Sequence, residues 1–473
     1  MGKSQELVKN TIIITIGKIC TQFLSFFLLP LYTAVLTTTE YGTVDLLMTY
    51  QQLIGYIAFF QIEQAIFRFL IEVRGTERET SEIVSSCFGF AIIQAICLAV
   101  IFGFIKFMTG YTYSLYLYLY VIAVISSGLM LQIARGIGEN KIYALGSFIS
   151  AISTIILNII FLVVFHFGVE GMLTSYILGN LFCALVVFFI LHAYRYLRIS
   201  SFRLSVLKKC LRYSIPLVPN ALSWWIMSAS DRTIVAYMLG TSFNGLLTVA
   251  NKFSTAFTSF YTIFNLSWTE SAALHINDDD ADVFFKGVIH RVYKLFSSAA
   301  IGIIAVMPFV FNILVNENYA DAYYQIPIYM LASLCQTFQG MYSVIYVALK
   351  KTKEISKTTT VSALINIIVD FALIKMVGLY AASISTLVAY LFLCIWRYFD
   401  LKKYMDVRFN PKLMFLSIVV AIIVCITYYI RNTLLSIGAL VLAIMYAIKL
   451  NKEILLLIMK SPKNIKNIIT HKH

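Results

Sequence analysis

Residues 83–107 read IVSSCFGFAIIQAICLAVIFGFIKF, a run that carries no charge before Lys106. A helix rises about 1.5 Å per residue, so such a run crosses the roughly 30 Å hydrocarbon layer of a membrane. Similar runs recur along the 473 residues, and 60% of the chain is hydrophobic. The sequence therefore predicts an all-α polytopic membrane protein with about fourteen transmembrane helices. The predicted spans are 11–36, 43–70, 83–107, 112–134, 142–166, 169–193, 213–240, 243–270, 292–316, 323–349, 357–377, 379–399, 413–431 and 433–450.

The net charge of +14 follows the predicted topology. With a cytoplasmic N-terminus, thirty of the 37 Lys and Arg residues fall in inner segments, whereas the outer loops hold Lys106, Lys375 and Arg431. Positive-inside insertion produces this split, and basic inner segments attract anionic membrane lipids. We therefore expect both termini in the cytoplasm and no nucleic-acid partner. The first span is too long for a signal-peptide core, so we expect it to stay uncleaved.

An internal repeat relates the two halves of the chain. Residues 9–17 (KNTIIITIG) align with residues 212–220 (RYSIPLVPN), and the same offset of 203 places 41–44 (YGTV) on 244–247 (NGLL). Each repeat contains six crossings, an even number, so both enter the membrane in the same orientation. The expected organisation is a six-helix lobe at 1–200, a second at 201–400, and two further helices with a basic cytoplasmic tail at 401–473.

Polar side chains recur at helical spacing along several spans, which places them on one face of each helix. A face that holds Lys, Glu or Asp predicts a hydrated cavity, because a charge at the bilayer centre costs roughly 2.5–3.5 kcal/mol. For faces of Ser and Thr alone, hydrogen bonding between helices is the alternative. The second span carries Asp45, Thr49, Gln52, Tyr56 and Glu63, and the fifth carries Ser147, Ser150, Thr154 and Asn158. The candidate cavity residues are Lys18, Gln22, Gln52, Tyr56, Glu63, Asp231, Arg232, Asn251, Lys252 and Asn265.

The depths of the charges within the spans predict two ion pairs. Lys18 and Glu63 each lie about 10 Å from the inner boundary, and Asp231 and Lys252 each lie roughly 13 Å from the outer one. Adjacent residues on a helix point about 100° apart, so an ion pair between Asp231 and Lys252 leaves Arg232 without a carboxylate partner. A cation in a polar cleft favours an anion, and the guanidinium fork suits phosphate. The alternative is that Arg232 reaches the outer headgroups.

Four further features of the sequence belong together: the opening 9–17, the turn 39–42 (TEYG), the link 134–143 (ARGIGENKIY), and the run 230–240 (SDRTIVAYMLG) leading to 245–253 (GLLTVANKF). These segments resemble bacterial polysaccharide flippases of the Wzx-like type, which share a superfamily with MATE multidrug exporters and lipid II flippases. The resemblance covers nearly the whole chain.

The resemblance implies a transporter without cofactor, metal or catalytic residues, in the cytoplasmic membrane of a bacterium. Its implied substrate is a polyprenyl-pyrophosphate-linked oligosaccharide, moved from the inner to the outer leaflet by alternating access for polysaccharide biosynthesis. A charged headgroup needs a hydrated cleft, and Tyr56, Tyr261 and Trp268 are candidates to stack on sugars. By analogy, the pairs Lys18–Glu63 and Asp231–Lys252 are gates, and other polysaccharide-assembly proteins are potential partners.

Three other functions remain open at this point. A multidrug or cation exporter of the same architecture needs an acidic or aromatic site, and Glu63, Asp231 and Asp370 are available. A lipid II flippase is close in chemistry. A membrane polysaccharide polymerase or glycosyltransferase usually has a large outer loop or a cytoplasmic nucleotide-sugar domain, and the sequence shows neither.

Overall fold

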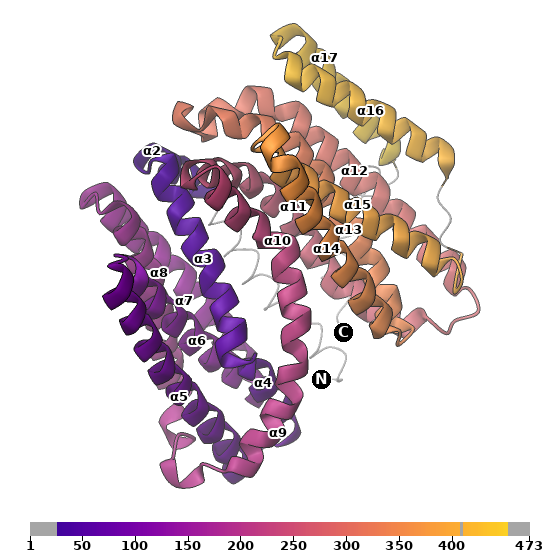
Figure 1. Ribbon diagram of the computed structural model, residues 1–473. Coiled ribbons are helices and arrows are strands. Elements are labelled where there is room, and N and C mark those ends of the chain that lie inside the picture. The colour runs from indigo at the N-terminus through magenta and orange to yellow at the C-terminus, as the bar shows by residue number, and fades with distance from the viewer. Residues whose placement is uncertain (1–25, 407–409, 453–473) are drawn as a thin grey trace, which may run out of the picture. The chain divides into compact units, whose positions relative to one another are not determined.

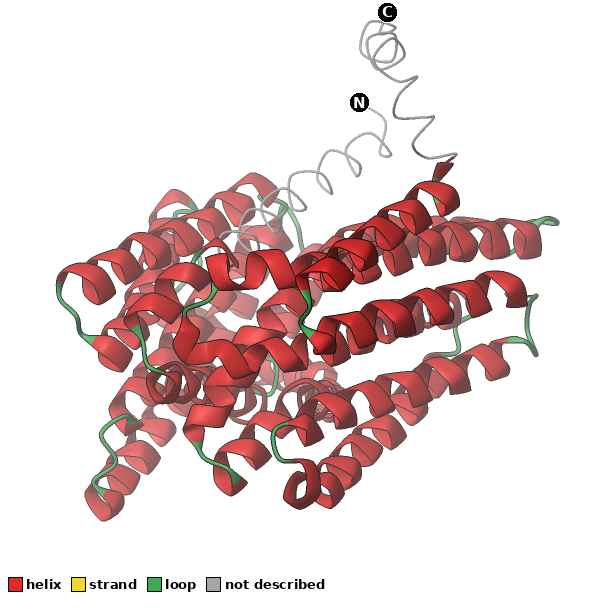
Figure 2. Ribbon diagram, turned by 90° about the horizontal axis from the view of Figure 1, so that it is seen from above, coloured by secondary structure: helices red, strands yellow, loops and turns green. Residues whose placement is uncertain are grey.

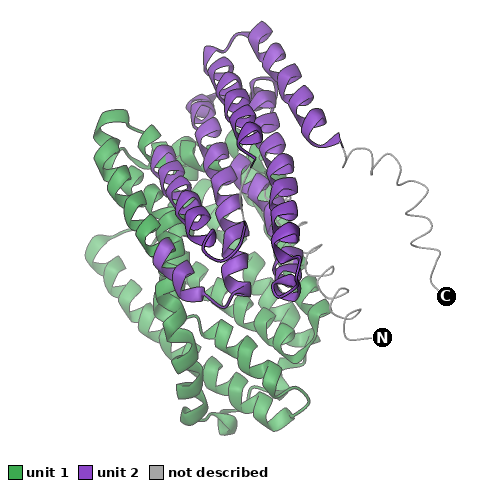
Figure 3. Cartoon of the chain, turned by 90° about the vertical axis from the view of Figure 1, so that its right-hand side faces the viewer, with its two compact units in different colours: residues 1–252, 359–382 green, residues 253–358, 383–473 purple. Residues whose placement is uncertain are grey.

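The computed structural model describes residues 26–406 and 410–452, and over these residues it consists of helices joined by short loops (Figures 1 and 2). No strand occurs within those two ranges, so the all-α prediction is confirmed there. Internal contacts divide the chain into two compact units, coloured separately in Figure 3. Unit 1 comprises residues 1–252 and 359–382, and unit 2 comprises residues 253–358 and 383–473.

Unit 1 is built from the N-terminal helices and the middle of the chain. Its helices are α2 (Leu29–Val35), α3 (Thr38–Phe59), α4 (Ile62–Glu72), α5 (Glu77–Thr109), α6 (Ser114–Ile137), α7 (Asn140–Asn158), the π-helix η1 (Ile159–Val164), α8 (Gly168–Ile190), α9 (Leu204–Ser214) and α10 (Val218–Met238). Short 3₁₀ turns, η2 (Ala193–Arg195), η3 (Ile199–Ser201) and η4 (Ile215–Leu217), join α8 to α10.

Unit 2 contains α12 (Ala281–Leu314), the 3₁₀ segment η5 (Glu317–Gln325), α13 (Ile326–Ala348), α16 (Pro411–Ile430) and α17 (Thr433–Leu450). Three helices, α11 (Thr241–His275), α14 (Thr352–Val377) and α15 (Tyr380–Leu401), contribute residues to both units.

Nine helices of the described residues are long and apolar enough to cross a membrane, or ten if α3 and α4 form one broken span. This agrees with a multi-pass membrane protein. The predicted spans at 213–240, 243–270 and 323–349 coincide with α10, α11 and α13, which are long enough but fall outside that apolar set. Most of the first predicted span lies outside the described residues.

The predicted span 43–70 is broken rather than continuous. The axes of α3 and α4 differ by 57°, and the two residues between these helices, Phe60 and Gln61, adopt the left-handed conformation with φ of 49° and 52°. Left-handed backbone ends the helical ladder, so a new helix starts at Ile62. The break puts Glu63 in the first turn of α4, where the helix dipole favours a carboxylate.

Ordinary capping signals set many of the helix ends. Thr37 and Glu40 form a capping box at the start of α3, in which each side chain accepts from the other residue's backbone N–H. Gly110 and Gly138 end α5 and α6 with positive φ. Asn432 caps α17. These signals fix the short turns that let neighbouring helices pack side by side.

Small residues let the helices of unit 1 approach closely. A Cβ atom at Gly179 of α8 would lie 2.2 Å from Thr154 Oγ1 of α7, and one at Gly136 of α6 would lie 2.7 Å from Leu70 Cβ of α4. Neither distance is possible for a real side chain, so only glycine fits there. Close backbone approach of this kind supplies the packing that replaces the hydrophobic effect inside a bilayer.

Arg397 joins three helices of unit 2. Its guanidinium is fully buried and donates to Gln339 and Ser343 of α13 and to Thr358 and the Ile355 carbonyl of α14. The distances to Gln339 Oε1 and Thr358 Oγ1 are 2.6 and 3.1 Å. A buried guanidinium requires such a set of acceptors, so Arg397 fixes α13, α14 and α15 against one another in this unit.

The last two helices form a hairpin packed on α12. Near its loop, the Tyr428 hydroxyl donates to the Tyr323 carbonyl at 2.7 Å, and the two rings stack with centroids 4.1 Å apart. At the other end, the hydroxyls of Tyr446 and of Ser297 on α12 are 3.1 Å apart, and Asn451 donates to Ser298 of α12 at 3.0 Å. Polar contacts at both ends therefore hold the hairpin to the rest of unit 2.

Candidate functional site

An ion pair joins α10 to α3 inside unit 1. Arg232 Nε lies 3.3 Å from Asp45 Oδ2, and the two side chains are only 21% and 12% exposed. Arg232 Nη1 also donates to Thr49 Oγ1 at 3.4 Å, and Trp225 Nε1 donates to the Thr49 carbonyl at 3.0 Å. These contacts fix the arginine along the face of α3 that the sequence predicts to be polar.

Lys252 of α11 belongs to the same charged group. Asp45 is the carboxylate that attracts it electrostatically, and Arg232 is the cation that opposes it. Both cations therefore interact with the Asp45 carboxylate, and we call Asp45, Arg232 and Lys252 the basic cluster. Its formal excess of positive charge favours an anion.

These contacts correct the sequence-based assignment of Arg232 as the residue left over. Among the described residues Arg232 forms an ion pair with Asp45, and the pair of Asp231 with Lys252 stays a prediction. Asp231 accepts from the backbone N–H of Arg232 at 2.9 Å. Asp231 and Lys252 lie at one predicted depth, but the long side chain of Arg232 reaches Asp45 near the start of α3.

Asp231 interacts electrostatically with a second carboxylate, that of Asp370 on α14. Both oxygens of Asp370 are buried and make no hydrogen bond among the described residues. Next to them, the hydroxyl of Ser230 lies 3.3 Å from Asn366 Oδ1. Two buried carboxylates repel when both are charged, so this acidic pair favours a proton or a small cation.

Three further candidates continue along α3 and α4. Gln52 Nε2 donates to the Tyr56 hydroxyl one helical turn away, at 2.8 Å. Tyr56 in turn interacts electrostatically with Glu63 across the break between the helices. Glu63 Oε2 is buried without a hydrogen-bond partner in the described part of the chain. Lys18 and Gln22 lie outside the described residues, and so does the predicted pair of Lys18 with Glu63.

The candidate cavity residues on α11 lie in two different units. Asn251 precedes Lys252 in the part of the helix that belongs to unit 1. Asn265, in the unit 2 part, accepts from the Tyr261 hydroxyl at 2.9 Å. Tyr261 and Trp268 are buried, and Trp268 donates to the Met341 carbonyl at 3.3 Å while packing against phenylalanine rings. These two aromatic side chains are used in packing, so in this structure they are not available to stack on a sugar.

Equivalent positions of the two sequence repeats meet where α3 and α11 begin. A Cβ atom at Gly42 would lie 1.9 Å from the Thr241 carbonyl oxygen, and one at Gly245 would lie 2.0 Å from the Thr38 carbonyl oxygen. Asn244 Nδ2 donates to the Gly42 carbonyl at 2.8 Å, and the hydroxyls of Thr38 and Ser242 are 2.7 Å apart. We call this contact the glycine crossing. It holds the start of α3 against the start of α11 within unit 1, on the two helices that carry Asp45 and Lys252.

Sequence reasoning did not assign Asp45 or Thr49 to the site. Both residues belong to the predicted polar face of the second span, but their partner on α10 follows from three-dimensional packing alone. The helical spacing of Asp45, Thr49 and Gln52 was the available signal, because it puts the three on one side of the helix.

Comparison with known proteins gives one family and one fold. The family model described as polysaccharide biosynthesis protein matches residues 7–268. No curated protein matches the chain. Among solved structures, the lipid II flippase MurJ in an inward closed conformation has a TM-score of 0.70 at 15% identity, covering 94% of this chain and 100% of that one. An inward-facing multidrug resistance MATE family transporter of the MOP superfamily has a TM-score of 0.67 at 14% identity, covering 82% and 98%. At these identities the likeness concerns the fold.

Proposed function

Because the chain belongs to the polysaccharide biosynthesis protein family and crosses a membrane many times, we propose that it is a flippase for polyprenyl-pyrophosphate-linked oligosaccharide. It moves this lipid-linked oligosaccharide across the cytoplasmic membrane of a bacterium by alternating access between two six-helix lobes, with both termini in the cytoplasm. The chain acts as a transporter rather than as an enzyme, and it presents its substrate to other polysaccharide-assembly proteins.

The observation that carries this proposal is the basic cluster. A pyrophosphate cannot cross hydrocarbon without compensation for its charge, and the basic cluster offers two cations, Arg232 and Lys252, beside the Asp45 carboxylate. The guanidinium that now faces the Asp45 carboxylate presents the same fork to a phosphate oxygen. A pyrophosphate therefore competes with Asp45 for Arg232, while the prenyl chain stays in lipid.

Substrate binding and helix movement are coupled through this competition. Asp45 on α3 holds Arg232 on α10 when no anion is bound. An anion that takes over Arg232 releases α3 from α10, so the bound and empty proteins favour different arrangements of these helices. The predicted gates Lys18–Glu63 and Asp231–Lys252 remain part of the proposal.

The acidic pair supports coupling of transport to a proton or a small cation. Asp231 and Asp370 lie on the same helices, α10 and α14, that Ser230 and Asn366 join. Charging both carboxylates requires a cation between them or nearby. The same pair is what a multidrug or cation exporter needs, so that function is the second candidate.

Genetic complementation tests the proposal. Deletion of the gene in its host should cause polyprenyl-linked oligosaccharide to accumulate on the cytoplasmic face, and wild-type protein should remove it. Arg232→Ala should fail to do so, and Arg232→Lys should rescue partly because it keeps the charge without the fork. The matched control is Arg78→Ala, which removes an arginine from an exposed ion pair with Glu82.

Two results would contradict the proposal. If the deletion causes drug sensitivity without accumulation, the chain is an exporter. If Arg232→Ala transports as well as Arg78→Ala, the basic cluster does not bind substrate. Sugar transfer by the purified protein would instead indicate a polymerase or glycosyltransferase.

A further inference from the structure

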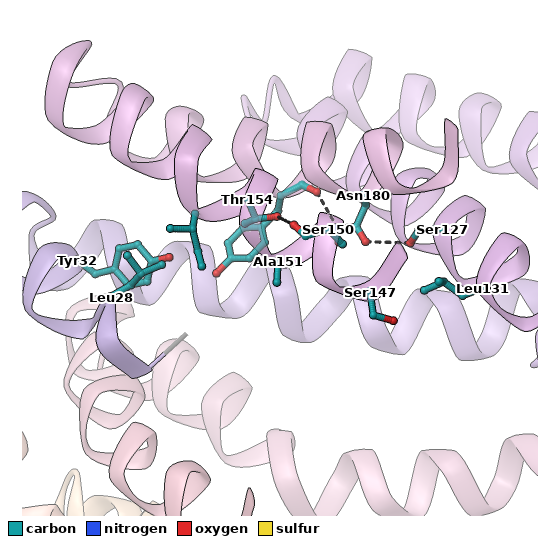
Figure 4. A pocket seen from close by; sticks show the side chains of 11 residues that line it. Leu28, Tyr32, Ser127, Leu131, Ser147, Ser150, Ala151, Thr154 and Asn180 are labelled. Atoms are coloured by element: carbon teal, nitrogen blue, oxygen red, sulfur yellow. Dashed lines mark hydrogen bonds between the residues drawn. The ribbon is translucent and has the colours of Figure 1, made fainter. Parts of the chain in front are cut away.

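A pocket of about 330 Å³ lies within unit 1 between α2, α6, α7 and α8 (Figure 4). Its lining is polar but uncharged. The polar side chains are Ser147, Ser150 and Thr154 of α7, Ser127 of α6, and Tyr176 and Asn180 of α8. No Asp, Glu, Lys, Arg or His is among its described lining residues. The pocket is therefore distinct in chemistry from the basic cluster and from the acidic pair.

The hydrogen bonds around the pocket make it rich in acceptors. Ser147 and Thr154 donate to carbonyls of their own helix at 3.0 and 2.8 Å, and Ser127 donates to Asn180 Oδ1 at 2.9 Å. A hydroxyl whose proton is used in this way still has lone pairs to accept with. Ser150 Oγ makes no hydrogen bond with any described residue. The lining thus suits a ligand that brings many O–H donors.

Tyr32 closes one side of the pocket in a fixed orientation. Its hydroxyl accepts from Asn158 Nδ2 at 2.9 Å and interacts electrostatically with Tyr176. Asn158 is fully buried, and its Oδ1 has no partner among the described residues. The π-helix η1 begins directly after Asn158, and such segments are frequent at functional sites.

The chemistry of this lining excludes the other parts of a lipid-linked glycan. A pyrophosphate in the pocket would face hydrogen-bond acceptors and no cation. A prenyl chain there would leave the hydroxyls and the amide of the lining without hydrogen-bond partners. A drug cation would find no carboxylate. An uncharged sugar brings several hydroxyl donors, and about 330 Å³ is near the lower limit of ligand pockets, roughly 300–1,000 Å³, which suits about one or two sugar rings.

The pocket also lies next to the basic cluster. Tyr176 interacts electrostatically with Asp45, and α8 packs against α3. The pocket and the basic cluster therefore lie near each other within unit 1, as a ligand that occupies both requires. We propose that the pocket binds the uncharged sugar adjacent to the pyrophosphate, while the basic cluster binds the pyrophosphate itself. This inference rests on the proposed function. Recognition of the glycan then begins at its linkage to the lipid.

Protection of an introduced cysteine tests this assignment. Ser150→Cys in the full-length protein, reconstituted in vesicles, is labelled with an uncharged maleimide, and wild-type protein gives the background from the native cysteines. Two probes are compared: undecaprenyl pyrophosphate and the same lipid carrying one N-acetylglucosamine. The sugar-bearing lipid should slow labelling, and the sugarless lipid should not. Binding of both lipids is measured separately by native mass spectrometry.

Pocket variants give an independent readout. Asn180→Leu should weaken binding of the sugar-bearing lipid about two- to tenfold, the effect of one lost hydrogen bond, and leave binding of the sugarless lipid unchanged. Thr154→Val should act in the same direction. Thr109→Val is the matched control, because Thr109 makes the same bond to its own helix, at 2.8 Å, on an exposed surface.

The outcomes separate this inference from the function on which it rests. If both lipids bind but the sugar gives no added protection, the pocket is a water-filled helix contact and this proposal is wrong. If Asn180→Leu weakens both lipids equally, the pocket does not read the sugar. If neither lipid binds the wild-type protein, the proposed flippase function fails together with it.

Discussion

Replacing Gly42 with alanine should separate α3 from α11. The new Cβ atom would lie 1.9 Å from the Thr241 carbonyl oxygen, whereas ordinary contacts begin at 3.4 Å, so the helices must move apart by about 1.5 Å. That displacement breaks the hydrogen bonds of Thr38 with Ser242 and of Asn244 with Gly42. Overpacking costs about 1–3 kcal/mol, and each lost hydrogen bond costs about 0.5–1.5 kcal/mol. A total near 3 kcal/mol lowers the population with the crossing closed about 100-fold.

Disulfide cross-linking measures that population. The hydroxyls of Thr38 and Ser242 are 2.7 Å apart, so Thr38→Cys with Ser242→Cys places two thiols close together in the closed crossing. The cysteine pair has already removed the hydrogen bond between Thr38 and Ser242, so adding Gly42→Ala should slow cross-linking by somewhat less than this factor, and it should reduce transport. Gly128→Ala is the control, since a Cβ atom there meets nothing within 4 Å. Equal cross-linking rates in the two glycine variants would refute the steric argument.

The other predictions concern charges and hydrogen bonds. Asp45→Asn removes the carboxylate shared by Arg232 and Lys252, so the protein should bind undecaprenyl pyrophosphate more tightly but release it more slowly; unchanged affinity in vesicles would contradict this. Asp370→Asn should make transport insensitive to pH and cations while substrate binding persists, and a transport assay over pH and sodium concentration checks both. Arg397→Met should destabilise the protein by about 2–4 kcal/mol, because buried acceptors on α13 and α14 lose their donor; a melting temperature equal to that of wild type would oppose it.

Composition and periodicity were sufficient for the helical membrane fold, because lipid permits few other solutions. The offset of 203 that aligned residues 41–44 with 244–247 also placed Gly42 opposite Gly245, and the structure brings these glycines into the glycine crossing. The direction of each side chain, by contrast, could not be predicted. Depth put Asp231 level with Lys252, yet the ion pair forms between Arg232 and Asp45.

The break in the second span had no sequence signal. Phe60 and Gln61 adopt left-handed backbone although neither is glycine or asparagine, and no proline follows them. Tertiary packing of α4 against α6 and α9 determines that geometry, and a single sequence does not report such packing. The aromatic residues Tyr261 and Trp268 show the same limit, since helical spacing does not separate a ring that lines a cavity from one buried against a neighbour.

The hairpin of α16 and α17 is fastened to unit 2 near Tyr428 and again near Asn451. The 18 residues of α17 separate these attachments by about 27 Å. A hairpin held at two such points neither rotates nor slides against α12, so the hairpin and α12 move as one rigid body. Leu434, 78% exposed beside the loop, is therefore a position from which a spectroscopic label reports the motion of the unit beneath it.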